Sequence, residues 1–310
     1  MTADQWYQYR RRMPRRQSRR EMAKRHSHAD GRGAARHQMH LSGMETPGVF
    51  LLTLVTGVLA GFVDSIAGGG GLLTLPVLLT LLPSPTQTIA TLKAQNLFGT
   101  LAATVHFTRQ GLVQPRTKIA GIVSALAGGA AGAIAVQVMS PALLMTMVPI
   151  LLVAVALYVA CSPRASDIDS QQRLSPLWFG ILVIPAIAFY AGFFGPGTGV
   201  FFMIAFVALR GYGLLKAIAN TKLLDCMASA GAVLLFLAGG QIVWPVAIVM
   251  GIGQALGAYA GATFVIRRGA AVVRPVLVVV SLTITCKLVF DNPESWMRQL
   301  VEHGIRAFAG

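Results

Sequence analysis

The sequence contains few charged residues. They make up 12% of the 310 residues, whereas 55% are of apolar types, and a soluble domain carries about 25% charged residues. The mean hydropathy is +0.64. This balance excludes an ordinary soluble enzyme and a disordered chain. It predicts an all-α, polytopic integral membrane protein.

Cysteine is scarce as well, and its positions form no ligand pattern. Cys161, Cys226 and Cys286 lie in or beside apolar runs, and no Cys-x-x-Cys occurs. We therefore expect no disulfide framework, no metal site and no cofactor. His-Glu-x-x-His and Gly-x-Ser-x-Gly are also absent. Because both are common hydrolase motifs, we expect a protein that is not an enzyme.

Basic residues are concentrated at the N-terminus. Residues 1–40 hold 11 Lys or Arg and 3 Asp or Glu. Such a segment suits nucleic acid or the cytoplasmic side of a membrane, and the positive-inside bias favours the second. We expect residues 1–45 to be a disordered cytoplasmic tail that contacts anionic lipid and binds no nucleic acid.

Long runs without charge predict the membrane helices, because one bilayer crossing needs about 20 apolar residues. We expect about eight transmembrane helices, a linker at 163–175 and a polar tail at 291–310. The runs divide into a first membrane repeat over 46–162 and a second over 176–290. The expected segments are 47–66, a short arm at 71–82, 88–108, 119–139, 142–162, 176–194, a short arm at 197–209, 216–238, 245–266 and 271–290.

Five sequence blocks recur in the same order in the two halves. One pair is Ala60-Gly61-Phe62 and Ala191-Gly192-Phe193, each followed by a glycine cluster. Basic loops in one half correspond to uncharged loops in the other, which indicates inverted repeats. With the basic tail inside, the loop charges require one glycine-broken element to cross the membrane fully and the other to be a hairpin, unless one loop breaks the positive-inside rule.

The glycine clusters predict broken helices at equivalent places in the two repeats, the sequence pattern of a transporter site near the midplane. The N-terminal ends of the short arms would present N–H groups and a positive dipole to an anion. Tight helix packing is the alternative explanation for the glycines. The candidate binding or pathway residues are Asp64, Gly68, Gly69, Gly70, Gly71, Lys93, Gly195, Gly197, Thr198, Gly199, Asn220, Lys222 and Asp225.

Ionisable residues inside apolar runs support this site, because they are costly in a bilayer. Lys93 and Lys222 occupy equivalent repeat positions, and Asp225 lies on the same helical face as Lys222. Snorkelling of the two lysines and a purely structural Lys222–Asp225 pair remain open alternatives.

The string Gly61-Phe62-Val63-Asp64-Ser65-Ile66-Ala67-Gly68-Gly69-Gly70-Gly71, with Ala90-Thr91-Leu92-Lys93, resembles the sulfite exporter TauE/SafE family. The second-half segments 192–199 and 219–222 resemble that family's second repeat. The resemblance spans roughly residues 48–290 and implies a permease of the bacterial inner membrane. The implied substrates are sulfite or organosulfonates.

We therefore expect a secondary transporter of small anions that works by alternating access, with a proton as a candidate coupling ion. An anion channel, or a transporter of an unrelated small solute, is the alternative. We also expect Lys222→Ala to lower flux more than Lys93→Ala, because Lys222 follows Asn220-Thr221. The sequence leaves the substrate, the direction of transport and the oligomeric state open.

Overall fold

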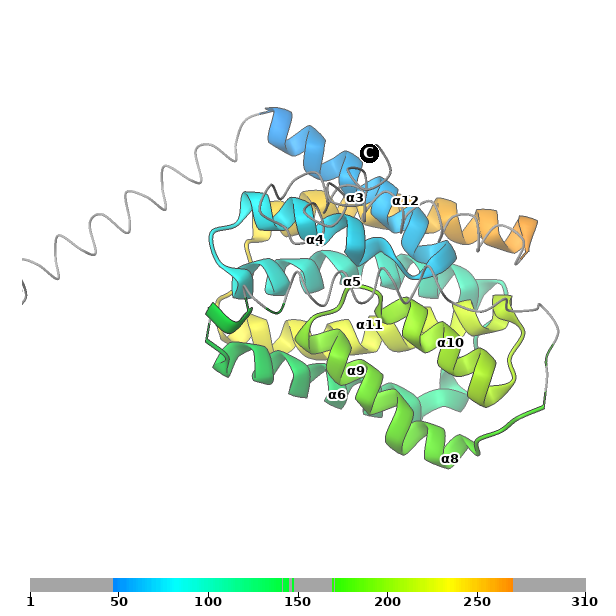
Figure 1. Ribbon diagram of the computed structural model, residues 1–310. Coiled ribbons are helices and arrows are strands. Elements are labelled where there is room, and N and C mark those ends of the chain that lie inside the picture. The colour runs from blue at the N-terminus through cyan, green and yellow to red at the C-terminus, as the bar shows by residue number, and fades with distance from the viewer. Residues whose placement is uncertain (1–46, 141, 145–146, 148–168, 170, 270–310) are drawn as a thin grey trace, which may run out of the picture. The chain divides into compact units, whose positions relative to one another are not determined.

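The computed structural model describes residues 47–140, 142–144, 147, 169 and 171–269, and the regular elements in these ranges are all helical (Figure 1). The expected tails at 1–45 and 291–310, the span 271–290, most of 142–162, part of the linker, Cys161 and Cys286 lie outside the described residues. The elements are α3 (Pro47–Ala67), α4 (Gly70–Leu81), α5 (Pro85–Arg109), η1 (Pro115–Lys118), α6 (Ile119–Val138), α8 (Pro176–Trp178), η2 (Phe179–Val183), α9 (Ile184–Phe193), α10 (Thr198–Arg210), α11 (Leu214–Ala238) and α12 (Trp244–Arg268).

The chain forms two compact units, Met1–Phe50 and Leu51–Gly310. The described part of the first unit is the opening turn of α3, residues 47–50. The packing described below concerns the second unit.

Proline and glycine set where the helices begin and break. Pro85 and Pro176 stand in the first turn of their helices, where a missing N–H costs nothing and φ is already helical. Gly68 (φ +76°), Gly195 (φ +101°) and Gly197 (φ +80°) adopt left-handed backbone conformations, which glycine reaches without a Cβ clash. These glycines end the longer helices and start the short helices α4 and α10.

Five of the described helices are long and apolar enough to cross a membrane: α3, the continuous α8–η2–α9 stretch, α6, α11 and α12. Helices α4 and α10 are apolar but shorter. Helix α5 has 25 residues, but Lys93, Gln95 and Asn96 lower its hydropathy. The observed bounds agree with the expected spans within three residues. The total of about eight crossings stays a prediction.

The last described helix of each half, α6 or α12, packs against helices of the other half. Helix α6 packs against α9 and α11, and α12 packs against α5; α12 also contacts α3 from Leu54 onward. We call α3, α4, α5 and α12 the first bundle, and α6, α8, η2, α9, α10 and α11 the second bundle. Helices α5 and α11 contact each other where the bundles meet (Figure 1).

Glycines bring the swapped helices together. A Cβ on Gly257 of α12 would overlap the backbone of Val58, and a Cβ on Gly132 of α6 would overlap the backbone of Phe189. Small residues allow such close crossing of membrane helices. These glycines therefore have the packing role, whereas those at 68–71 and 195–199 lie at the helix breaks.

The connections between helices divide into a basic end and an uncharged end. At the basic end, Lys118 before α6 contacts Tyr212 between α10 and α11, and His106 near the end of α5 contacts Thr263 near the end of α12. At the other end, Gly239 lies beside Gln137, and the N–H of Val243 donates to Thr91. The connections there, at 82–84, 139–140 and 239–243, contain no charged residue. In Figure 1 the basic end is on the right.

Both glycine-broken elements are hairpins, so of the two alternatives left open by the loop charges, one full crossing with one hairpin does not hold. Helix α3 runs parallel to α12, with Leu54 beside Gly253 and Phe62 beside Gly261, and α4 turns back so that Gly70 lies against Ala60. In the second half, Leu209 at the end of α10 bonds to residues 173 and 174 just before α8. The sequence could not show that both elements are hairpins, because a glycine-broken hairpin and a full membrane crossing both consist of uncharged apolar residues.

Candidate functional site

The two helix breaks meet in the middle of the second unit. A Cβ on Gly199 would lie 2.5 Å from the Cα of Gly68, and a Cβ on Gly71 would lie 3.0 Å from the Cα of Pro196. Side chains at these positions would force the hairpins apart. The glycine clusters thus allow the N-terminal ends of α4 and α10 to approach each other.

A small cavity lies at this junction. Its lining combines glycines of both breaks with side chains of α3, α5 and α11. About 10 Å³ of it is open to the centre of a water molecule, roughly the space for one water. The lining residues are Asp64, Gly68, Gly71, Leu92, Lys93, Asn96, Gly195, Gly197, Gly199 and Asp225.

A buried ion pair borders the cavity. The Nζ of Lys222 lies 2.6 Å from Oδ2 of Asp64, and the two side chains are 1% and 5% exposed. The N–H of Gly70 donates to Oδ1 of Asp64 at 3.3 Å. Lys222 therefore pairs across the bundle boundary with Asp64, and not along α11 with Asp225.

The other two charges of the site lack such a partner. Lys93 is 2% exposed, and in the part of the chain that the structure describes it forms no ion pair. Its Nζ fills the space where a Cβ of Gly195 would stand. Asp225 is equally buried, and its Oδ1 makes no hydrogen bond to any described residue. Both groups face the same cavity.

Backbone donors complete the site. Among the described residues, no acceptor bonds the N–H groups of Gly71, Gly197 or Gly199. All three glycines line the cavity and lie in or beside the first turn of α4 or α10. An unpaired N–H in a membrane interior is costly unless water or a ligand satisfies it.

The structure brings most of the candidate residues together. Gly69 precedes α4 directly, and Thr198 opens α10, with its hydroxyl donating to the carbonyl of Gly195 at 2.5 Å. Asn220 is the exception, because its side chain lines a different cavity near the basic end. Leu92 and Asn96 line the site but were not among the candidates. Their position one residue before and three residues after Lys93 is the signal that could have indicated them.

The cavity combines hydrogen-bond donors with charges of both signs. No group of three His, Cys, Asp or Glu residues that could hold a metal occurs among the described residues. Two helix N-termini, free N–H groups and a buried ammonium offer positive charge and donors at one point.

The chain is similar to known membrane proteins over most of its length. The family model described as sulfite exporter TauE/SafE matches residues 53–288. A probable membrane transporter protein of Sinorhizobium sp is 41% identical over 76% of this chain and 91% of its own length. The probable membrane transporter protein YfcA of Escherichia coli K12 is 38% identical over 80% and 93%. One of Haemophilus influenzae is 40% identical over 79% and 97%.

No solved structure significantly matches this chain. The relatives come from bacteria and are named as transporters, and the described helices include several that are long and apolar enough to span a membrane. These findings support a multi-pass bacterial membrane protein with a transport function. The chain belongs to the sulfite exporter TauE/SafE family.

Proposed function

We propose that the protein is a secondary transporter of small anions in the bacterial inner membrane, and not an enzyme. The observation that carries this proposal is the cavity where the two helix breaks meet, lined by Lys93 and by unpaired N–H groups. Broken helices that point their N-termini at a midplane site are the usual way in which secondary transporters bind anions.

The proposed substrate is sulfite or an organosulfonate. The family description supplies the sulfur, and the site supplies the preference for a compact oxyanion. The ammonium of Lys93 offers three donors, and Gly71, Gly197 and Gly199 offer three backbone N–H groups. Oxygen atoms of a sulfite or sulfonate group can accept from several of these at once.

Alternating access is proposed because the halves have the features of inverted repeats. Helices α3, α4, α5 and α6 have 21, 12, 25 and 20 residues, and the second half follows with 18, 13, 25 and 25. The first hairpin starts from the uncharged end and the second from the basic end. Rocking of the two bundles around their junction would expose the small cavity to one side at a time.

Charge balance makes a proton the proposed coupling ion. With all four groups ionised, Lys93 and Lys222 balance Asp64 and Asp225, so the buried cluster is neutral. A bound monovalent anion adds one uncompensated negative charge, which is costly away from water. Protonation of Asp225, whose Oδ1 makes no hydrogen bond to any described residue, would restore neutrality. One proton would then accompany each anion.

The test is flux of labelled sulfite by purified protein in liposomes, with and without a pH gradient. Lys93→Met should raise the half-saturating concentration about 10- to 100-fold, because a hydrogen bond to a charged group contributes about 1.5–3 kcal/mol. Lys216→Met, at an exposed lysine, is the matched control. Asp225→Asn should transport without responding to the pH gradient. Wild-type kinetics in Lys93→Met would contradict the proposed site.

A channel with the same glycine loops is the second candidate, because the unpaired N–H groups could also serve as a fixed filter. Counterflow separates the two mechanisms. Unlabelled anion on the far side of the membrane accelerates entry of labelled anion through a carrier, but not through a channel. If neither sulfite nor another anion in a screen moves, the proposed function fails.

A further inference from the structure

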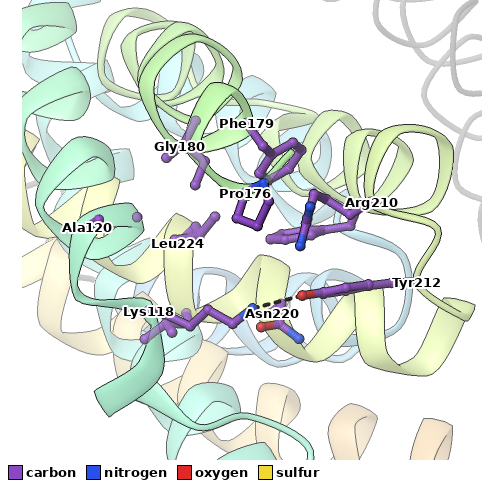
Figure 2. A pocket seen from close by; sticks show the side chains of 13 residues that line it. Lys118, Ala120, Pro176, Phe179, Gly180, Arg210, Tyr212, Asn220 and Leu224 are labelled. Carbon is purple, nitrogen blue, oxygen red and sulfur yellow. Dashed lines mark hydrogen bonds between the residues drawn. The ribbon is translucent and has the colours of Figure 1, made fainter. Parts of the chain in front are cut away.

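A second cavity lies at the basic end of the second bundle, where the start of α6, the end of α10 and the first turns of α11 surround the π-helix η2 (Figure 2). Its volume is about 160 Å³, far larger than the central cavity. We call it the basic pocket. The lining residues are Lys118, Ala120, Gly121, Pro176, Phe179, Gly180, Ile184, Phe206, Arg210, Tyr212, Asn220, Leu223 and Leu224.

Two cations of the basic pocket lack an acidic partner. Lys118 donates to the hydroxyl of Tyr212 at 2.8 Å, and Nη1 of Arg210 donates to the carbonyl of Leu174 at 2.8 Å. Within the described ranges, neither forms an ion pair; the nearby carboxylate of Asp169 bonds Lys216 instead. Figure 2 shows Lys118 and Tyr212 meeting above Asn220, with Arg210 beside Phe179.

Tyr212 reports the positive potential of the basic pocket. It lies in the connection between α10 and α11, outside the helices. Partial burial raises the pKa of its phenol, but the hydrogen bond from Lys118 and the charges of Lys118 and Arg210 outweigh this, so the pKa is lowered. The pocket therefore favours a negative charge close to this hydroxyl.

Apolar side chains share the lining with the cations, since Arg210 lies over the ring of Phe179 and Phe206 stacks on Tyr212. The apolar residues of the lining include Phe179, Ile184, Phe206 and Leu224. The π-helix η2 widens the helix at this point. π-Helical turns inside α-helices occur frequently at functional sites. A pocket in which cations without an acidic partner lie beside apolar side chains suits an anionic group with an apolar neighbour.

We propose that the basic pocket is an oxyanion-binding site, separate from the central cavity, that takes a phosphate or sulfonate group through Lys118, Arg210 and Tyr212. The group can come from the head of an anionic phospholipid or from a free anion. Basic pockets between membrane helices bind anionic head groups in this manner. Asn220 lines the basic pocket one turn before Leu224, on the helix that carries Lys222.

The proposal is tested by binding to the purified full chain in detergent, measured by thermal shift and intrinsic fluorescence. One arm titrates inorganic sulfate against chloride at constant ionic strength. The other compares short-chain phosphatidylglycerol with short-chain phosphatidylcholine. Saturable sulfate binding identifies a free anion, and binding of phosphatidylglycerol alone identifies a lipid. Binding of neither overturns the proposal.

The variant Lys118→Gln/Arg210→Gln should weaken binding at least tenfold, because each lost cation removes a charge-assisted hydrogen bond. Arg267→Gln/Arg268→Gln is the matched control, since it removes two charges from the end of α12, outside the pocket. Equal loss in both variants would indicate general surface charge and overturn the proposal.

Two further variants test whether loss of binding is due to misfolding and whether the basic pocket binds independently of the central cavity. Leu224→Trp keeps the cations but fills the pocket, and it should abolish binding if the first variant does not fold. Lys93→Met should leave the binding of phosphatidylglycerol, and the part of the sulfate binding that Lys118→Gln/Arg210→Gln removes, unchanged, because Lys93 lines the central cavity. Failure of anion transport would therefore leave the basic pocket testable on its own.

Discussion

Replacement of Gly199 by alanine tests whether the close approach of the two hairpins is needed for transport. The added Cβ would lie 2.5 Å from the Cα of Gly68 and 3.0 Å from its carbonyl oxygen. Carbon atoms in contact lie about 3.5–4.0 Å apart, so the junction must open by about 1 Å. Both contacts are backbone atoms, which cannot rotate away as a side chain can.

A 1 Å shift is large for this site. The cavity offers about 10 Å³ to the centre of a water molecule, and the donors that face it belong to the same glycine turns. A misplacement of about 1 Å in a binding constellation can lower a rate about 100-fold. We expect a loss of this order for Gly199→Ala, with about 1–3 kcal/mol of overpacking cost to stability.

Gly240→Ala is the control for destabilisation alone. Its φ is +62° and no atom lies within 4 Å of the added Cβ, so the variant bears a backbone cost of about 1–2 kcal/mol without a steric clash. Both variants are reconstituted at equal protein density, and initial flux is measured with an anion that the wild type transports. Wild-type flux in Gly199→Ala would refute the reasoning, because the junction would then have room for a methyl group.

Three further predictions follow from the charges. Lys222→Met should lower the free energy of unfolding by about 3–5 kcal/mol, because Asp64 is left buried without its partner. The double variant Asp64→Asn/Lys222→Met should recover most of this loss in thermal unfolding. Equal stability of the single and the double variant would argue against the ion pair. In an alkaline absorbance titration, Tyr212 should ionise at lower pH than an ordinary tyrosine, and Lys118→Gln should raise its pKa. Because the folded state favours the ionised phenol, the stability from this group should appear as pH rises and be complete above about pH 10. Single cysteines at Gln110, at the end of α5, and at Gln241 should react with impermeant reagents from opposite sides of the membrane. Labelling of both from one side would contradict the two-ended arrangement of the connections. Because α3 runs parallel to α12, toward the basic end, a cytoplasmic N-terminus would put the basic connections on the other side of the membrane, and the same labelling at the start of α3 tests which of the two is cytoplasmic.

The helices could be predicted closely from the sequence, and their starts less well. Helix α5 begins at Pro85, whereas the expected span began at residue 88. Pro85 and the polar residues after it have low hydropathy, so a span drawn from apolar residues begins too late. Proline is nevertheless common in the first turn of a helix. The π-helix at Phe179–Val183 was not expected, because tertiary packing selects this wider turn and leaves no periodic signal.

The sequence indicated which charged residues lie near one another, but not which of them form ion pairs. Glycine clusters and membrane-embedded charges indicated Asp64, Lys93, Lys222 and Asp225, since each is costly in a bilayer. Spacing along α11 suggested a link between Lys222 and Asp225, whereas Lys222 bonds Asp64, 158 positions away. Sequence spacing reports neighbours on one helix and gives no information on which helices meet.

The pairing changes which lysine is expected to bind the anion. The repeat context favoured Lys222, but its ammonium is already neutralised by Asp64, and displacing that contact would leave a buried carboxylate unpaired. Lys93 forms no ion pair with a described residue and lies against Gly195 of the opposite bundle. Both lysines therefore connect the bundles in different ways. Lys222 and Asp64 form an ion pair within the chain. The ammonium of Lys93 instead faces the central cavity, where a bound ligand would contact it. An anion bound at Lys93 and at the N–H groups of both hairpins would draw the bundles together, which is the energetic requirement for a carrier that closes around its substrate.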